Sequence, residues 1–240
     1  MQCVIVCVDY ADFLKWTLPS IVHQFDKTIV VTEDRDIDTI NLCKFYDVEY
    51  LTILGNKGIK INAGLNRLDK TKWVAQIDAD IYLPPQTINI IRHKQLDTQT
   101  LYGIDRCMCQ SYDQFIKFLD GKHQVYSEKF FTVPPFPIGA RLSQHYGKGY
   151  LPIGYFQLWH PLGSGVFNYP IDHENEGMYA RTDVKHIYKF DRTELISEVL
   201  AIHLESEVSS MGANWNGRVT TLFGAFSVGN VKNNEDLYTN

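Results

Sequence analysis

The sequence of 240 residues lacks both a long apolar run and an excess of positive charge. No stretch approaches the roughly 20 apolar residues that a membrane-spanning helix needs. The formal net charge of −5 argues against a surface that is basic throughout, although a local basic patch could still bind nucleic acid. Hydrophobic residues at 45% and charged residues at 21% are ordinary for a globular protein, so we expect a substantial core.

The first ten residues, MQCVIVCVDY, lack the basic segment that opens a secretory signal peptide, and they read as a first strand. Cysteine is scarce and odd in number, with five residues at positions 3, 7, 43, 107 and 109. Cys107 and Cys109 are a weak metal signal, because no second Cys/His pair has the spacing of a zinc site. We therefore predict buried, reduced thiols and a cytoplasmic protein.

Strands and helices alternate over the first half of the chain. Apolar runs predict strands over 3–10, 27–33, 48–53, 73–83 and 99–109, and helical spacing predicts helices over 10–24, 34–47, 56–70, 84–93 and 111–121. This alternation predicts an α/β fold, a Rossmann-like, mostly parallel sheet flanked by helices. Beyond residue 121 the pattern is less regular, with a strand expected over 154–161, a helix over 182–190 and a helix or strand over 194–204.

Acidic side chains lie at the carboxyl ends of three of the predicted strands. They are Asp9, then Glu33 with Asp34, then Asp78 with Asp80. Because the carboxyl ends of parallel strands share one edge, and ligands of such sheets bind there, we expect these groups to converge on one crevice.

Asp78 and Asp80 stand two positions apart in the run WVAQIDADIYLPP, residues 73–85. If both belong to one strand they share a face and could hold one hard cation, Mn²⁺ or Mg²⁺. Such a cation activates a nucleoside diphosphate as a leaving group. The alternative is a solvated strand end that precedes a helix.

The run NKGIKINAGLNRLDKTKWVAQIDADIYLPP, residues 56–85, resembles the central stretch of GT-A glycosyltransferases of the family 2 type. VIVCVDYADFLKWTLPSIVHQ and IVVTEDRD are similar to the opening strand and helix and to the second strand of that family, so the likeness covers residues 1 to about 105. Arg35 departs from the pattern, since a small residue is usual there, and base contacts at that loop are placed in doubt.

The resemblance implies a metal-dependent transferase of a sugar from a nucleotide-diphosphate donor, with UDP-sugar the expected form. Asp78 would face the ribose or the metal, and Asp80 would bind the metal directly. Asp9 with Glu33 or Asp34 would line the base pocket. Lys57 and Lys60 could reach the nucleotide, although both could also be the solvated start of a helix.

The second half supplies candidates for the remaining roles. Asp183, at the start of a predicted helix, is the expected catalytic base, because a helix start favours the carboxylate anion; Glu174 and Glu176 are its rivals. His203 follows an apolar run and is the expected third metal ligand, although it could equally be a buried core histidine. In the loop GANWNGR, Trp215 and Arg218 are expected to close over the donor. We thus predict a donor-binding half, 1–110, and an acceptor-side subdomain, 111–240.

Residues 115–150 are the expected acceptor surface. Five basic side chains outnumber two acidic ones there and alternate with aromatic residues: Lys117, Lys122, Lys129, Arg141 and Lys148 against Asp120 and Glu128. Such a surface suits stacking and phosphate binding, so the favoured acceptor is a hydroxymethylated pyrimidine in DNA, of the kind some phages glycosylate. A surface polysaccharide or lipid-linked glycan is the alternative, since aromatic rings also stack on sugars. A sugar-phosphate nucleotidyltransferase is disfavoured by the absence of a glycine-rich basic loop after the first strand, and a non-catalytic binding domain by the candidate site residues.

Overall fold

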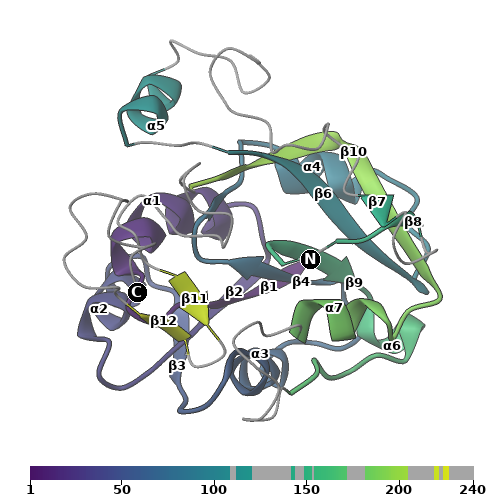
Figure 1. The fold of residues 1–240 in the computed structure, drawn as a ribbon, viewed down its shortest axis with the longest axis horizontal. Helices are drawn as coiled ribbons and strands as arrows, with labels where there is room; N and C mark the ends of the chain where they lie inside the picture. The colour runs from purple at the N-terminus through teal and green to yellow at the C-terminus, as the bar shows by residue number, and fades with distance from the viewer. Residues whose placement is uncertain are drawn as a thin grey trace, which may run out of the picture.

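A single eight-stranded sheet organises the chain. The computed structural model describes residues 1–108, 112–120, 142–143, 149–152, 154–171, 182–204, 219–221 and 224–226. The order of the main sheet is β3-β2-β1-β4-β9-β6-β10-β5, and its strands are the apolar runs of the sequence (Figure 1). Their bounds are β1 (Gln2–Val6), β2 (Lys27–Thr32), β3 (Glu49–Thr52), β4 (Val74–Asp78), β5 (Ile81–Tyr82), β6 (Thr100–Met108), β9 (Phe156–Trp159) and β10 (Arg192–His203).

The strands of the first half are parallel, and the second half completes the same sheet. β1 pairs with β2 and β4, and β2 with β3, all in parallel. β9 inserts antiparallel between β4 and β6, whereas β10 runs parallel to β6. The two predicted halves therefore share one sheet. The prediction of an α/β fold with a mostly parallel sheet is confirmed.

Helices cover both faces of this sheet. They are α1 (Ala11–Val22), α2 (Ile37–Phe45), α3 (Lys57–Leu65), α4 (Thr87–Arg92), α5 (Tyr112–Leu119), α6 (Pro161–Ser164) and α7 (Thr182–Ile187). One core cluster packs α1, α2, α4 and α5 on one face, and a second packs α3 and α7 on the other (Figure 1). Side-chain caps fix three of these helix starts: Asp36 accepts from Thr39 N at α2, Asn56 from Ile59 N at α3, and His160 from Gly163 N at α6.

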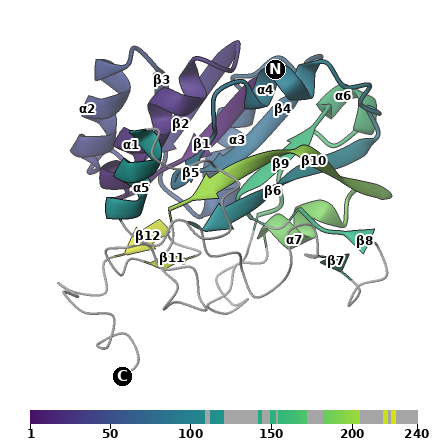
Figure 2. The same cartoon turned by 90° about the horizontal axis from the view of Figure 1, so that it is seen from above.

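Two short hairpins complete the described part of the chain. β7 (Leu142–Ser143) pairs with β8 (Gly149–Tyr150), and β11 (Val219–Thr221) pairs with β12 (Gly224–Phe226). Each forms a two-stranded sheet separate from the main one, as the view from above shows (Figure 2). Among the described helices, none has the length and apolarity to cross a bilayer.

The structure corrects one predicted strand and decides one open alternative. The strand expected over 73–83 ends at Asp78, and the chain turns at Ala79 and Asp80 before the separate strand β5. The turn lets the Asp80 carbonyl accept a hydrogen bond from Leu204 N, and β5 then pairs with the end of β10. Of the segment 194–204, for which the sequence allows helix or strand, residues 194–203 belong to β10.

Three cysteines support the expectation of reduced thiols. Cys3, Cys7 and Cys43 are free and buried. Burial raises the pKa of Cys43 and that of Cys3 to about 12, so neither thiol is a reactive thiolate at neutral pH. The cytoplasmic location stays a prediction.

Candidate functional site

The acidic strand ends gather at one edge of the sheet, as the sequence predicts. Val6 of β1 lies in register with Val31 of β2 and with Asp78 of β4. These three strands therefore end together, and Asp9, Glu33 and Asp78 all lie at their carboxyl ends.

Asp78 is held by two donors on the side of the sheet that faces α3. Lys57 Nζ lies 2.6 Å from Asp78 Oδ1, and Gln76 Nε2 donates to the same oxygen at 2.8 Å. Gln76 shares a face of β4 with Asp78 because the two residues are two positions apart within the strand. The exposed fractions of the Lys57 and Asp78 side chains are 18% and 27%, so the pair is half-buried.

The first turn of α3 packs against the second half of the chain. A Cβ atom at Gly58 would lie 2.1 Å from the Pro170 carbonyl oxygen, so only glycine allows this approach. Asn62 donates to the Tyr169 carbonyl at 2.9 Å and accepts from Tyr169 N at 2.7 Å. Lys57, the residue before Gly58, is thereby fixed at the place where the two halves meet.

Asp183 lies near enough to Lys57 for their charges to interact. It belongs to the first turn of α7, and its main-chain carbonyl accepts a hydrogen bond from Gln157 Nε2 at 3.2 Å. Burial raises the pKa of Asp183, the charge of Lys57 opposes that rise, and the nearby Asp78 adds to it. Main-chain hydrogen bonds at the helix start lower this pKa, as expected, but desolvation is the larger effect.

Lys57 is the positive centre of a group of carboxylates. Burial by itself would lower the pKa of Lys57, but Asp78, then Asp183 and Asp80, raise it above the ordinary value. The ammonium is therefore charged at neutral pH. Three aspartates act on it, two at the end of β4 and one from α7, and the approach of α7 to this strand end could not be read from the sequence.

Asp80 has a different partner from Asp78. Asp80 Oδ2 lies 3.3 Å from His203 Nε2, and both side chains are buried. His203 Nδ1 contacts the Arg106 guanidinium, whose carbon lies 4.6 Å from the centre of the Tyr155 ring. A guanidinium can only donate hydrogen bonds, so Nδ1 of His203 must be the acceptor. The ring hydrogen of the neutral histidine is then on Nε2, which donates toward Asp80.

The predicted metal ligands fit a divalent cation only in part. The Asp78 and Asp80 carboxylates are oxygen ligands of the kind that Mg²⁺ and Mn²⁺ accept. His203 does not fit, because a ring nitrogen that carries hydrogen cannot bind a metal, and the other nitrogen faces a guanidinium. Within the described ranges, no three His, Cys, Asp or Glu side chains are grouped so that they could hold a metal ion. Asp78 and Asp80 also do not share a strand face, since the turn separates them.

Ion pairs join the residues of the predicted base pocket. Arg35 bridges Asp9 and Glu33 at 2.8 Å and 2.9 Å, and Lys60 donates to Glu33 at 2.8 Å. Burial opposes ionisation of Glu33, but Lys60 and then Arg35 outweigh it, so the pKa of Glu33 falls below its usual value. Lys60 is fully buried and serves this ion pair, whereas Asp34 is exposed. A nucleotide base would therefore have to displace Arg35.

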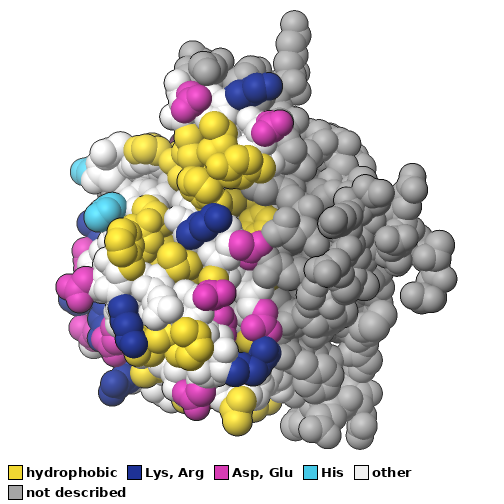
Figure 3. All heavy atoms as spheres, turned by 90° about the vertical axis from the view of Figure 1, so that its left-hand side faces the viewer, with side chains coloured by type: hydrophobic (Ala, Val, Ile, Leu, Met, Phe, Trp, Pro, Cys, Tyr) yellow, Lys and Arg dark blue, Asp and Glu magenta, His cyan; other side chains and the backbone are white. Residues whose placement is uncertain are grey.

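Several predicted residues lie outside the described ranges. They are Trp215, Arg218, Glu174, Glu176 and most of the segment 115–150. Helix α5 is the described beginning of that segment. On the face over α1, α2 and α5, positive and negative side chains are mixed among apolar ones (Figure 3).

Sequence reasoning missed the polar residues that support the site. Gln76 and Gln157 are opposite each other in β4 and β9, both fully buried, and they contact Asp78 and Asp183 respectively. Both could have been recognised in the sequence as polar residues inside otherwise apolar strands. Arg106 carried a similar signal in the run GIDRCMC.

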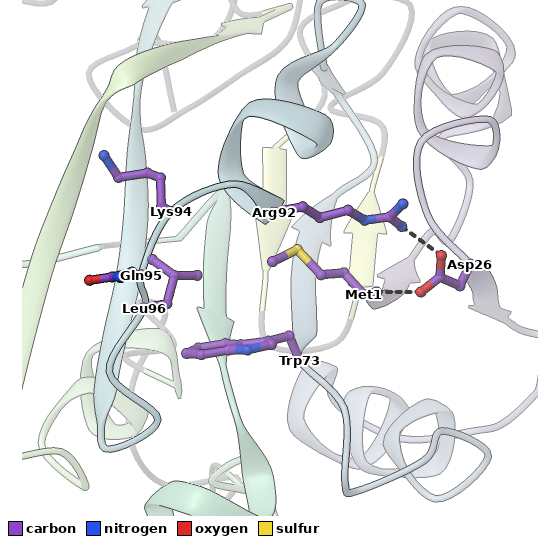
Figure 4. A pocket seen from close by; sticks show the side chains of 7 residues that line it. All are labelled: Met1, Asp26, Trp73, Arg92, Lys94, Gln95 and Leu96. Carbon is purple, nitrogen blue, oxygen red and sulfur yellow. Dashed lines mark hydrogen bonds and ion pairs between the residues drawn. The ribbon is translucent and has the colours of Figure 1, made fainter.

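Two cavities lie away from this site. One of about 690 Å³ is at the opposite end of β4, beside Trp73, Arg92 and Lys94, and Asp26 pairs with Arg92 at its rim (Figure 4). Another of about 570 Å³ lies beside Trp16, Tyr82 and Leu119. Neither includes an acidic strand end.

No protein-family model matches the chain, and no curated protein matches it either. Among solved structures, 4-diphosphocytidyl-2C-methyl-D-erythritol synthase from Anaerococcus prevotii is 17% identical over 82% of this chain and 87% of that one, with a TM-score of 0.43. The galactosyltransferase LgtC, in complex with donor and acceptor sugar analogs, is 12% identical over 81% and 73%, with a TM-score of 0.45. HddC from Yersinia pseudotuberculosis is 10% identical over 85% and 93%, with a TM-score of 0.48. Identities and TM-scores this low assign no activity to this chain.

Proposed function

We propose that the chain is a GT-A-type glycosyltransferase that moves a sugar from a nucleotide-diphosphate donor, a UDP-sugar, to an acceptor hydroxyl. The observation that carries the proposal is the convergence of Asp78, Lys57 and Asp183 between α3 and α7. A fixed ammonium beside a carboxylate of raised pKa offers both an anion-binding group and a proton acceptor at the carboxyl edge of the sheet.

Asp183 is the base in this proposal. The acceptor oxygen attacks the anomeric carbon, the bond from that carbon to the diphosphate oxygen breaks, and Asp183 takes the hydroxyl proton. The products are the glycosylated acceptor and the nucleoside diphosphate. A carboxylate whose pKa is raised toward the working pH accepts a proton more readily in the transition state than an ordinary aspartate.

The diphosphate would meet Lys57 first, since this is the cation fixed beside Asp78. A divalent cation, Mn²⁺ or Mg²⁺, held by Asp78 and Asp80, would supply further neutralisation of the departing diphosphate. The three carboxylates around Lys57 make such additional positive charge necessary, because a diphosphate beside them would otherwise be repelled.

For the acceptor we propose a hydroxymethylated pyrimidine in DNA, on the strength of the basic and aromatic composition of residues 115–150. A direct test incubates the protein with Mn²⁺ and UDP-glucose or GDP-mannose, together with hydroxymethylated DNA or with a glycan acceptor. Mass spectrometry should show the DNA gaining one hexose. Transfer to the glycan alone would leave the transferase proposal standing and overturn the DNA acceptor. Cleavage of the donor or transfer of a nucleotidyl group, without sugar transfer, would overturn both.

A further inference from the structure

We propose that Lys57 acts as a built-in competitor of divalent cations: in the ligand-free protein its ammonium occupies the cation position at Asp78 and keeps Mn²⁺ and Mg²⁺ out. This inference deepens the proposed function because it concerns the same site. Its test uses no sugar nucleotide, so the inference and the proposed function can fail separately.

The geometry places Lys57 where a cation would bind. Its Nζ lies 2.6 Å from Asp78 Oδ1, the distance of a charge-assisted hydrogen bond. Gln76 donates to the same oxygen, so that oxygen already accepts two hydrogen bonds. A cation at Asp78 must therefore displace the ammonium or share the carboxylate with it.

The main chain at Lys57 is also held in place, so an ion can displace the ammonium only by moving the lysine side chain. Gly58 is packed against the Pro170 carbonyl and Asn62 is hydrogen-bonded to the main chain of Tyr169, so the helix start cannot shift. The lysine side chain is largely buried and serves Asp78, Asp183 and Asp80 together. No other described lysine or arginine contacts Asp78 at ion-pair distance, so the neutralisation of this carboxylate by the described residues rests on Lys57.

The protein alone also offers few ligands. Described side chains do not form a group of three metal ligands, and His203 presents a hydrogen-bearing nitrogen to Asp80. Mg²⁺ is commonly bound by one or two carboxylates together with substrate phosphates. A diphosphate would attract the Lys57 ammonium away from Asp78 and supply the missing oxygen ligands. In the wild type, tight cation binding would then wait for the donor, whereas removal of the ammonium alone would leave the carboxylates around it free to hold the ion weakly.

The test measures Mn²⁺ binding by electron paramagnetic resonance on the protein without nucleotide. Three variants are compared with the wild type: Lys57→Met removes the charge, Lys57→Arg keeps it, and Lys57→Met combined with Asp78→Asn removes the ligand as well. Circular dichroism confirms that each is folded, and Lys57→Gln replaces Lys57→Met if the latter is not. We expect Lys57→Met to bind one Mn²⁺ at least tenfold more tightly than the wild type and Lys57→Arg, and the double variant to lose that gain.

Two results would overturn the inference. The wild type could bind Mn²⁺ as tightly as Lys57→Met, which would show that the ammonium does not compete. Alternatively, neither could bind it, which would show that something other than Lys57 keeps the ion out. Neither result bears on sugar transfer, which the mass-spectrometric assay measures independently.

Discussion

Lys57 Nζ and Asp78 Oδ1, 2.6 Å apart, join the first residue of α3 to the last residue of β4. The two residues are 21 positions apart in the sequence, and Asp183, much later in the chain, acts on the same ammonium. This acidic strand end is thus half-buried and paired, and it is not merely solvated. The consequences of this arrangement can be measured one group at a time.

The buried pair of Lys60 and Glu33 should be a stability element and not a nucleotide contact. Their side chains are only 1% and 9% exposed. Lys60→Met leaves the Glu33 carboxylate with Arg35 alone, so we expect a loss of about 3 kcal/mol in the free energy of unfolding by urea denaturation. Lys44→Met, at an exposed position of α2, should cost no more than about 0.5 kcal/mol.

The pH dependence supplies an independent check on the same pair. Because the pKa of Glu33 is lowered in the folded protein, the stability that the pair provides is present above the ordinary pKa of 4.5 and is lost as the pH falls through the lowered value. An equal loss on Lys60→Met and Lys44→Met would contradict the buried-pair interpretation.

Asp183→Asn should impair transfer without impairing donor binding. Removal of a general base costs about 10²- to 10⁴-fold in rate, whereas the amide keeps the size of the side chain. As the pH is lowered, the transfer rate of the wild type should begin to fall at a pH above the ordinary aspartate pKa of 3.8, because burial raises the pKa of Asp183.

The change in stability caused by Asp183→Asn should have the opposite sign from the loss caused by removing one partner of an ion pair. A raised pKa means that the wild type loses stability as the pH rises from 3.8 through the folded-state pKa of Asp183. We therefore expect the neutral variant to be at least as stable as the wild type at neutral pH. An unchanged transfer rate in Asp183→Asn, measured with saturating donor, would exclude it as the base.

His186 should make the protein sensitive to acid. It is fully buried against Tyr169, Trp159 and Phe190, and neither ring nitrogen has a hydrogen-bond partner in the described structure. Burial lowers the pKa of His186 from 6.5 to about 3. As the pH falls below 6.5, the unfolded chain is protonated first, so the folded state loses about 1.4 kcal/mol for each pH unit.

His186→Phe tests this expectation directly. Between about pH 6.5 and pH 5 the wild type should lose about 2 kcal/mol more than the variant in chemical denaturation. His23→Gln, at an exposed position, should leave the wild-type slope unchanged. Parallel slopes for the wild type and His186→Phe would show that the imidazole is not held neutral.

The sequence predicted the order of elements through the first half because each central strand is a continuous apolar run and apolar residues recur at helical spacing in each helix. It also predicted the acidic edge, since parallel strands end together. It failed at Ala79 and Asp80, where a long-range pairing of β5 with β10 interrupts the apolar run. No local pattern carries that information.

The partners of the acidic groups were equally beyond the sequence. Lys57 and Lys60 were expected near a nucleotide, but their first contacts are carboxylates of neighbouring strands. The pairing of Arg106 with His203 depends on the register of β6 and β10, which places residues 97 positions apart side by side. Such contacts follow from topology and cannot be derived from spacing.

The most direct test of the account is the thermal unfolding of the protein with UDP- and GDP-sugars, with and without Mn²⁺. A donor at about one hundred times its dissociation constant should stabilise the folded state by about 2.7 kcal/mol, and Mn²⁺ should enlarge the shift. The shift should disappear in Asp78→Asn and persist in Asp38→Asn, an exposed control in α2. Absence of stabilisation by every sugar nucleotide, or an equal shift in Asp78→Asn, would contradict the account.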